Sequence, residues 1–261
     1  MVWSRRAALF GGVSFSPLSL FAASEPGCWF DPSDISTLFQ DAAGTTPVTA
    51  AGQSVGLVLD KSGRGNHATQ PTSLSRPTYQ VDSNGRGYLN FDGSDDFLVT
   101  PTITPGTDKA QVFAGVRKLS DAATGTVIDL NGVAATNAIM LRAPSGSAAN
   151  YVWYSSGSLA FVGALSANSF AAPITNVVTG IGDISADTQV LRINGAQAAA
   201  PSVDQGTGNY LASPFYIGRR GGTALPFNGR IYGLICRFGA NLTAAQIAQT
   251  EAWVNSKTGA Y

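Results

Sequence analysis

The stretch from Tyr88 to Val99, which reads YLNFDGSDDFLV, decides the fold class. Two short apolar runs, Tyr88–Phe91 and Phe97–Val99, flank the polar sequence DGSDD. Apolar runs of strand length joined by a turn that contains Asp-Gly predict a β-hairpin. Similar short runs recur along the chain, separated by turn signals such as Asn131-Gly132 and Asn194-Gly195. We therefore expect an all-β sandwich or barrel built from about a dozen short strands.

Two segments carry more specific structural signals. Gln111–Arg117 (QVFAGVR) has apolar or small side chains on both faces, which predicts a strand that is covered on both sides. Near the end, Thr243 and Gln246 form a capping-box pattern that predicts the start of a helix. This helix should continue through Val254 and stop near Gly259. Because its apolar content is modest, we expect it to lie against one edge of the sandwich.

Composition narrows the class of partner. The chain has 261 residues, of which 44% are hydrophobic and 12% are charged. This length suits one all-β domain, and the charged share is about half that of an average soluble domain. The 16 basic and 16 acidic residues cancel, without a long run of either sign. The sequence therefore predicts no nucleic-acid partner and no attachment to anionic lipid, whereas a glycan or another protein is compatible with it.

Residues 1–24 (MVWSRRAALFGGVSFSPLSLFAAS) differ in character from the rest of the chain. A basic pair followed by an apolar stretch and small residues is the outline of a secretory signal peptide. Glycine, serine and proline interrupt the apolar stretch, which also makes a transmembrane helix and membrane insertion poor expectations. The alternative is an arm that docks on a neighbouring subunit and orders on binding. The docking candidates would then be Trp3, Arg5, Arg6, Leu9 and Phe10. In both interpretations the sandwich comprises residues 25–261.

Three segments carry a family resemblance: Trp29–Asp34 (WFDPSD), Asp60–Gln70 (DKSGRGNHATQ) and Phe91–Leu98 (FDGSDDFL). They resemble the LamG-like, concanavalin A-like lectin domains of phage and prophage virion proteins. Residues 229–239 and the helix after them are similar to the end of such domains. The resemblance implies a concanavalin A-like jelly-roll β-sandwich of two antiparallel sheets with one short C-terminal helix. It also implies a role in recognising sugars or surfaces.

The two cysteines, Cys28 and Cys236, are too few for a disulfide framework or a cysteine-based zinc site. One lies near the start of the predicted sandwich and the other in a late strand. The first and last strands of many jelly rolls are neighbours, so a disulfide is geometrically possible. Two buried thiols that act as small hydrophobic side chains are the alternative.

Catalytic residues are scarce. Glycoside hydrolysis needs two carboxyl groups placed together, yet Glu25 and Glu251 are the only glutamates and lie outside the predicted strands. Most aspartates fall in turns, where they usually cap backbone groups. His67 is the only histidine, and beside Asn66 it is expected to order a loop. We therefore predict that the protein is not an enzyme, with a glycoside hydrolase as a weaker alternative.

Binding candidates come from residue types that suit sugars and calcium. Aromatic rings stack on sugars and planar polar groups bond to hydroxyls; the candidates are Tyr151, Trp153, Tyr154, Arg142, Tyr210, Arg219 and Arg220. Trp153 could instead be core packing, and the loop of Arg219 and Arg220 could make a subunit contact.

No cofactor is expected, although calcium prefers the oxygen ligands of Asp and Asn. Its candidates, which match no defined calcium loop, are Asp60, Asn66, Asp92, Asp95 and Asp96.

With the role that the resemblance implies, we expect a non-enzymatic virion structural protein of a tail fibre, tail tip or head decoration. It would display a lectin-like domain that binds host-surface glycan or protein. We expect a homo-oligomer that contacts other virion proteins through its N-terminal arm. The alternative is a secreted or periplasmic carbohydrate-binding lectin whose leader is removed.

Overall fold

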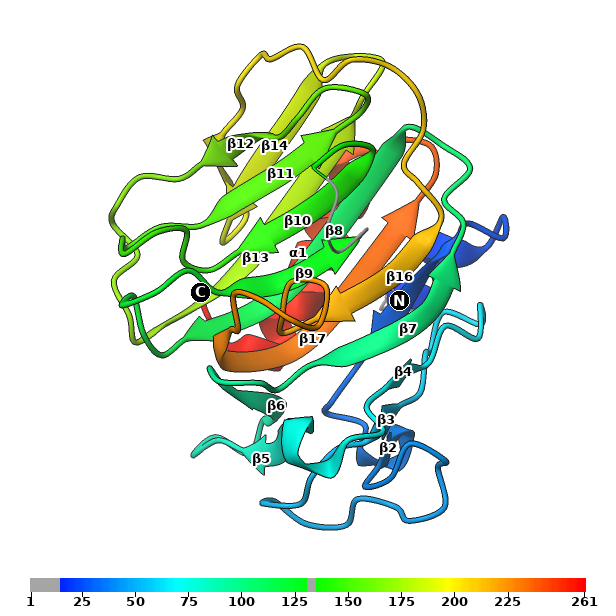
Figure 1. Cartoon of the computed structure of the whole chain (residues 1–261), viewed down its shortest axis with the longest axis vertical. Helices are drawn as coiled ribbons and strands as arrows, with labels where there is room; N and C mark the ends of the chain where they lie inside the picture. Colours follow the sequence, from blue (N-terminus) through cyan, green and yellow to red (C-terminus); the bar gives the residue numbers. More distant parts are fainter. Residues whose placement is uncertain (1–14, 131–134) are drawn as a thin grey trace, which may run out of the picture.

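The computed structural model describes residues 15–130 and 135–261. Within these residues, strands form two antiparallel sheets that pack face to face as a jelly-roll β-sandwich (Figure 1). Sheet A has eight strands in the order β15-β14-β13-β8-β17-β6-β5, with β1 also paired to β17. Sheet B has nine strands in the order β12-β11-β10-β9-β16-β7-β4-β3-β2. The predicted fold class is confirmed.

The elements have the following bounds. Sheet A contains β1 (Gly27–Phe30), β5 (Thr78–Val81), β6 (Gly87–Asp92), β8 (Lys109–Lys118), β13 (Ile174–Asp183), β14 (Thr188–Ile193), β15 (Ala196–Ala199) and β17 (Asn228–Phe238). Sheet B contains β2 (Leu38–Phe39), β3 (Leu57–Val58), β4 (Ala68–Thr69), β7 (Leu98–Ile103), β9 (Thr126–Leu130), β10 (Ala138–Arg142), β11 (Val152–Ser156), β12 (Val162–Leu165) and β16 (Ser213–Ile217). The helices are η1 (Pro17–Phe21), η2 (Ile35–Thr37), η3 (Ser73–Ser75) and α1 (Ala244–Thr258). None of the described helices is long and apolar enough to cross a membrane.

Strand β8 is covered on both faces, as its sequence predicts. Val112, Ala114 and Val116 point into the main core between the two sheets. Phe113 points the other way and joins a second apolar cluster on the outer face of sheet A. Apolar residues at successive positions therefore reflect two separate cores, one on each side of the same strand.

The hairpin predicted around DGSDD is wrong. Strand β6 pairs with β5 and β17 in sheet A, whereas β7 pairs with β16 and β4 in sheet B. The segment from Asp92 to Phe97 is thus a crossover between the sheets. Phe91 and Leu98, on either side of it, are fully buried in the main core. Apolar runs around a turn show that both flanks are buried, but they do not specify which strands pair.

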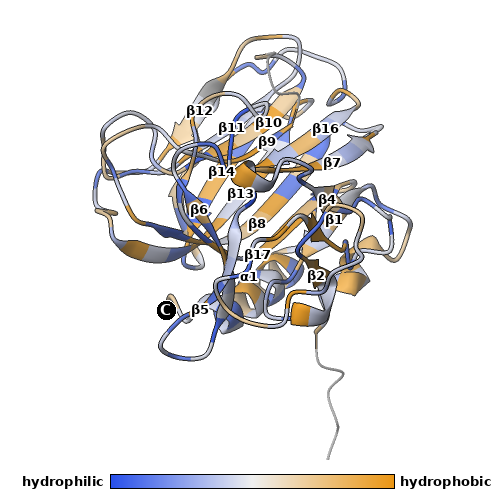
Figure 2. Cartoon of the chain, turned by 60° about the horizontal axis from the view of Figure 1, so that its bottom comes forward, coloured by the Kyte–Doolittle hydropathy of each residue, from blue (hydrophilic) through white to orange (hydrophobic). Residues whose placement is uncertain are grey.

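Helix α1 begins and ends where the sequence predicts. Thr243 and Gln246 form the capping box, and Gly259 ends the helix in the left-handed conformation at φ 59°. Its predicted position at an edge of the sandwich is wrong, because α1 lies across β8, β13 and β17 in the middle of sheet A (Figure 2). The outward side chains of these strands are apolar and need a cover, which α1 supplies.

Part of the expected N-terminal arm packs against the sandwich. Leu20 and Phe21 of η1 are buried in the second apolar cluster together with Trp29 and Val254. Arg237 Nε also donates a hydrogen bond of 2.8 Å to the Leu20 carbonyl oxygen. The docking candidates Trp3, Arg5, Arg6, Leu9 and Phe10 lie outside the described residues. The boundary expected at residue 24 stays a prediction.

Cys28 and Cys236 are cross-strand neighbours in the pairing of β1 with β17. Both are buried free thiols, so the structure favours the small-hydrophobe interpretation over the disulfide. Burial, and then the hydrogen bond with Cys236, raises the pKa of the Cys28 thiol well above its ordinary value. A thiol held neutral in this way is a poor nucleophile.

Candidate functional site

The outer face of sheet B is the candidate site. On sheet A, α1 and η1 cover the outward side chains of the central strands. On sheet B, the residues that alternate with the core positions form one row of cross-strand neighbours through all nine strands. The row consists of Phe39, Leu57, Thr69, Val99, Tyr216, Asp129, Met140, Tyr154 and Gly163.

A loop between β16 and β17 crosses the middle of this row (Figure 1, orange). The Gly221 N–H donates a hydrogen bond of 3.0 Å to Asp129 Oδ2, and the Thr126 N–H donates one to the Leu225 carbonyl oxygen. Asp129 and Met140 are therefore buried although they point out of the sandwich. The loop leaves a more accessible region on each side of it.

One of these regions holds an aromatic–arginine cluster, formed by Arg142, Tyr154 and Phe161. The Tyr154 and Phe161 rings lie 5.3 Å apart between centroids. The Arg142 guanidinium lies 4.9 Å from the centre of the Tyr154 ring, and its Nη1 donates a hydrogen bond of 3.3 Å to the Tyr154 hydroxyl. All three side chains are partly exposed, and Arg142 Nε is buried without a hydrogen-bond partner.

Asp129 lies at the base of this region. Burial raises the pKa of its carboxyl to about 6, whereas the hydrogen bond from Gly221 and the charges of Arg220 and Arg142 oppose that rise. The structure thus brings together three of the sequence candidates, Arg142, Tyr154 and Arg220. Sequence reasoning missed Asp129 and Phe161. The position of Asp129 inside the apolar strand sequence TVIDL could have indicated its role, whereas nothing in the sequence singles out Phe161.

A groove of about 540 Å³ lies on sheet B on the other side of the β16–β17 loop. Leu57, Thr69 and Val99 of the outward row form its floor. His67 also lines it, and His67 Nδ1 accepts a hydrogen bond of 2.9 Å from the Asp60 N–H. The imidazole therefore orders the loop, as the sequence predicts. Row residues thus line accessible surface on both sides of the loop.

Tyr151 and Trp153 are corrected as sugar-binding candidates, because both are fully buried in the main core. The Tyr151 hydroxyl donates a hydrogen bond of 2.9 Å to Asn176 Oδ1, and the Trp153 indole N–H donates one of 3.0 Å to the Ile181 carbonyl oxygen. Both polar groups are satisfied within the protein. Tyr154 alone of this trio points outward, since successive strand residues face opposite sides.

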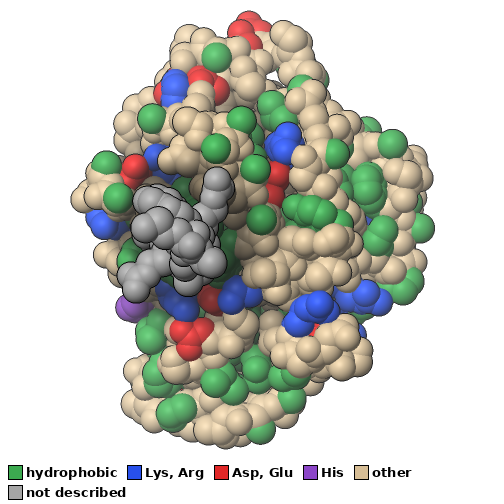
Figure 3. Space-filling model, turned by 180° about the vertical axis from the view of Figure 1, so that it is seen from behind, with side chains coloured by type: hydrophobic (Ala, Val, Ile, Leu, Met, Phe, Trp, Pro, Cys, Tyr) green, Lys and Arg blue, Asp and Glu red, His purple; other side chains and the backbone are tan. Residues whose placement is uncertain are grey.

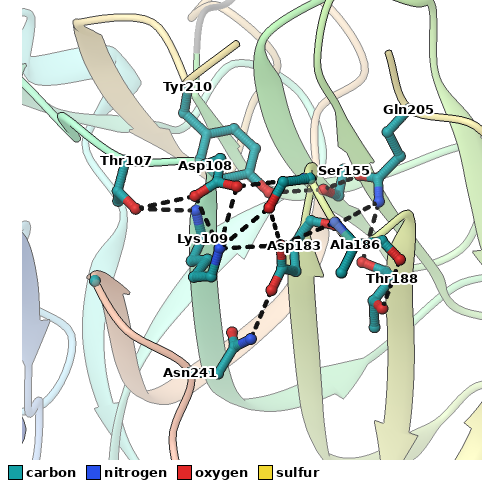
Figure 4. Close-up of polar contacts among 12 residues, drawn as sticks. Thr107, Asp108, Lys109, Ser155, Asp183, Ala186, Thr188, Gln205, Tyr210 and Asn241 are labelled. Carbon is teal, nitrogen blue, oxygen red and sulfur yellow. Dashed lines mark hydrogen bonds and ion pairs between the residues drawn. The ribbon is translucent and has the colours of Figure 1, made fainter. Parts of the chain in front are cut away.

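Tyr210 is corrected for the same reason. Its ring is buried, and its hydroxyl lies 2.7 Å from Ser155 Oγ, which in turn donates a hydrogen bond of 2.6 Å to Gln205 Oε1 (Figure 4). Arg219 donates hydrogen bonds to the Thr223 carbonyl oxygen of its own loop and to the Asp95 carbonyl oxygen of the crossover between β6 and β7. The hydrogen bonds of Tyr210 and Arg219 therefore stabilise the fold and do not point to a ligand.

The same end of the sandwich carries a second polar cluster (Figure 4). Lys109 Nζ lies 3.0 Å from Asp108 Oδ1 and 3.2 Å from Asp183 Oδ1. Asn241 donates a further hydrogen bond of 2.7 Å to Asp183 Oδ2. With the ammonium between them, the two carboxylates form an ion-pair network that joins β8 to β13.

The calcium candidates separate into two groups. Carboxylate oxygens of Asp92, Asp95 and Asp96 lie within 4.8 Å of one another. The Asp60 carboxylate instead accepts hydrogen bonds from the backbone N–H groups of Trp29 and Asn66, and so fastens its loop to β1. Calcium therefore stays a prediction for the Asp92–Asp96 turn alone.

Comparison with known proteins supports the fold. No protein-family model matches the sequence, and no curated protein matches it either. Botulinum neurotoxin type C, which depends on two ganglioside molecules to get into cells, is similar to this chain at TM-score 0.57 and 11% identity, over 88% of this chain and 51% of that one. The serotype D ligand-binding domain in complex with N-acetylneuraminic acid gives TM-score 0.57 and 13% identity, over 75% and 48%.

A third structure, the binding domain of botulinum neurotoxin DC in complex with rat synaptotagmin II, gives TM-score 0.55 and 14% identity over 76% and 49%. The chain spans about half the length of these solved structures. At such identities the likeness shows a shared jelly-roll β-sandwich fold.

Proposed function

We propose that this chain is a non-enzymatic recognition module that binds glycans through the outer face of sheet B. The aromatic–arginine cluster is the observation that carries the proposal. Tyr154 and Phe161 supply partly exposed rings for the apolar face of a sugar, and Arg142 supplies donors for its hydroxyls. The groove lined by Leu57 and Val99 would extend contact to a longer chain of sugars.

The solved structures of the same fold support a glycan or a protein as the class of partner. They were determined with, or in relation to, gangliosides, N-acetylneuraminic acid and synaptotagmin II. A protein surface on the host is accordingly the second class of partner for the same face.

The electrostatics of Asp129 favour binding over hydrolysis. A glycosidase needs a second carboxyl group opposite the first, at about 5–10 Å. The charges that act on the Asp129 pKa belong instead to Arg220 and Arg142. We expect the protein to release no reducing sugar from the polysaccharides that it binds.

For the biological setting, we propose display on a bacteriophage particle, in a tail fibre, tail tip or head decoration. The resemblance of WFDPSD and DKSGRGNHATQ to virion lectin domains supports this setting. A homo-oligomer docked through residues 1–14 would multiply weak sugar contacts by presenting many copies. The burial of Leu20 and Phe21 in the fold favours retention of this segment over cleavage near residue 24.

The alternative setting, a secreted or periplasmic lectin, is tested by the mature N-terminus. Mass spectrometry of the protein isolated from its native source should find a chain that begins at Met1 or its near neighbour. A mature chain that begins near Glu25 would support the secreted lectin and reject the docking arm.

Glycan-array binding tests the function itself. The wild-type protein should bind a defined set of glycans, and Arg142→Gln and Phe161→Ala should each weaken binding by about tenfold, or about 1.4 kcal/mol. Leu74→Ala is the matched control, since Leu74 is 86% exposed and lies on η3. If both cluster variants bind as the wild type does, the glycan site is elsewhere and the proposal fails.

A further inference from the structure

A second recessed site lies on sheet A, on the face of the molecule that also carries α1. It is a cavity of about 440 Å³ between the β5–β6 turn, strands β6, β17, β8 and β13, and the C-terminal end of α1. Its charged and aromatic lining consists of Asp82, Arg86, Tyr88, Arg117, Arg230 and Tyr232. We call this site the arginine pocket. Figure 3 views the molecule from behind, and Lys and Arg side chains gather in the lower half of that face.

Two of its arginines face each other across paired strands. Arg230 of β17 and Arg117 of β8 are direct neighbours in the antiparallel register. Like charges in this arrangement destabilise a sheet. Neither forms an ion pair with a carboxylate in the described part of the chain, whereas Lys109, Arg192 and Arg237 all do. In the described residues, no carboxylate ion pair therefore offsets the repulsion between these two arginines.

The Arg230 guanidinium interacts with the Tyr232 side chain, but neither arginine has a hydrogen-bond partner for its Nε atom. Arg117 Nη1 donates a hydrogen bond of 2.9 Å to Thr175 Oγ1, and the Arg230 guanidinium stacks 4.6 Å from the centre of the Tyr88 ring. The Nε atoms of both arginines are buried and have no partner. Buried donors without acceptors are costly, so an incoming oxyanion would be favoured both by charge and by hydrogen bonding.

The one acidic residue of the pocket is already engaged. Asp82 Oδ1 accepts hydrogen bonds from the backbone N–H groups of Asn84 and Arg86, at 2.8 and 3.0 Å. Asp82 Oδ2 lies 3.9 Å from Arg86 Nη1. Asp82 thus orders the β5–β6 turn and offsets part of the Arg86 charge. The lining keeps a net positive charge, concentrated on Arg117 and Arg230.

We propose that the arginine pocket binds the oxyanion substituent of an acidic sugar. Guanidinium forks match carboxylate, sulfate and phosphate oxygens in pairs. The cavity volume falls in the range of small-molecule sites. Tyr88 and Tyr232 are buried in the wall of the pocket, where Tyr88 supports the Arg230 guanidinium, and Thr175 offers a hydroxyl at the surface. This inference stands independently of the glycan site on sheet B, because it concerns the opposite sheet.

Calorimetric titration with D-glucuronate and D-glucose tests the proposal, because these sugars differ only in a carboxylate in place of a hydroxymethyl group. Glucuronate should bind, and glucose should bind at least about tenfold more weakly. Glucose 6-phosphate and inorganic phosphate identify the source of the oxyanion. Tight binding of either acidic sugar supports the site. The proposal is overturned if glucose binds as tightly as glucuronate. It is also overturned if inorganic phosphate binds as tightly as glucuronate and glucose 6-phosphate do.

Variants assign the binding to the pocket. Arg117→Gln and Arg230→Gln should each weaken glucuronate binding by about tenfold or more. The matched control is Arg64→Gln, since Arg64 is exposed on the β3–β4 loop. Each pocket variant relieves the cross-strand repulsion, so its melting temperature should equal or exceed that of the wild type. Full binding by both folded pocket variants would reject the assignment.

Discussion

At the scale of single residues, Asp96 is a turn aspartate that is destabilised by its environment. Burial and the charges of Asp92 and Asp95 raise the pKa of its carboxyl to about 7, from an ordinary value of 3.8. Between these two pH values the folded state holds a proton that the unfolded state has lost. The contribution of this carboxyl to the stability of the folded state is thus fully present below pH 3.8, and it is lost as pH rises through about 7.

Asp96→Asn should therefore raise the melting temperature at pH 8 and change it little at pH 3.5. An asparagine oxygen can still accept the hydrogen bond that the Asp92 N–H donates to Asp96. Differential scanning calorimetry in EDTA measures the difference. A stabilisation that is equal at both pH values would contradict the assigned protonation. A separate scan of the wild-type protein in calcium without EDTA tests the calcium prediction, since bound calcium raises the melting temperature.

Asp41 has the opposite behaviour. Hydrogen bonds from Thr45 and Thr46, whose backbone N–H groups donate to the carboxylate, hold the pKa of the Asp41 carboxyl well below its ordinary value. Its contribution to stability is present above pH 3.8 and is lost as pH falls and the folded carboxyl takes up a proton. We expect Asp41→Asn to lower the melting temperature at pH 7 and to converge with the wild type toward pH 2. A constant difference across that range would count against this role.

The segment Tyr151–Tyr154 shows how far residue-level prediction reaches. Strand alternation alone places Tyr151 and Trp153 on one face and Tyr154 on the other. The sequence does not indicate which face is the core, because aromatic side chains suit either. The pairing of β11 with β10 and its packing against sheet A decide it.

At the scale of elements, the two sheets meet closely where β11 crosses β13. A Cβ atom at Gly180 of β13 would overlap the Trp153 ring of β11. Gly180→Ala should therefore destabilise the protein by about 1–3 kcal/mol, as overpacked cores do. Gly233→Ala is the control, since a Cβ there would lie 3.5 Å from the nearest Trp253 atom, an ordinary contact. Urea unfolding compares the two, and equal stabilities would contradict the close approach.

The η1 helix makes a second test at this scale. Phe21 is buried against the outer face of sheet A, whereas Leu18 of the same helix is 51% exposed. We expect Phe21→Ala to cost about 3–5 kcal/mol of unfolding free energy. Leu18→Ala should change it by about 0.5 kcal/mol or less. If the two substitutions had the same small effect, η1 would not be an integral part of the fold.

Elements differ in how well local sequence specifies them. The bounds of α1 were predictable because the capping box of Thr243 and Gln246 and the stop at Gly259 act within a few residues. The hairpin around Asp92–Asp96 was mispredicted, because the partners of β6 and β7 lie far away in the chain. Strand pairing is a non-local choice, and a turn signal fits a crossover as well as a hairpin.

At the scale of the whole molecule, the two proposed sites belong to opposite sheets. The aromatic–arginine cluster lies on sheet B, and the arginine pocket lies on sheet A. Distant sites without shared partners are usually energetically additive. Phe161→Ala should thus keep wild-type glucuronate affinity, and Arg117→Gln should keep wild-type binding to the neutral glycans of the array. Titration and array measurements on both variants check this, and a mutual loss of binding would show that the sites are one or are coupled.

The sequence by itself determined the all-β class, the double-sided burial of β8, the terminal helix and the loop role of His67. Each follows from interactions within a strand, a turn or a helix end, where neighbours in sequence are neighbours in space. Only the tertiary structure decided the pairing of β6 and β7, the burial of Trp153 and Tyr210, and the meeting of Arg117 with Arg230. These depend on contacts between residues that are far apart in the chain, which no local pattern records.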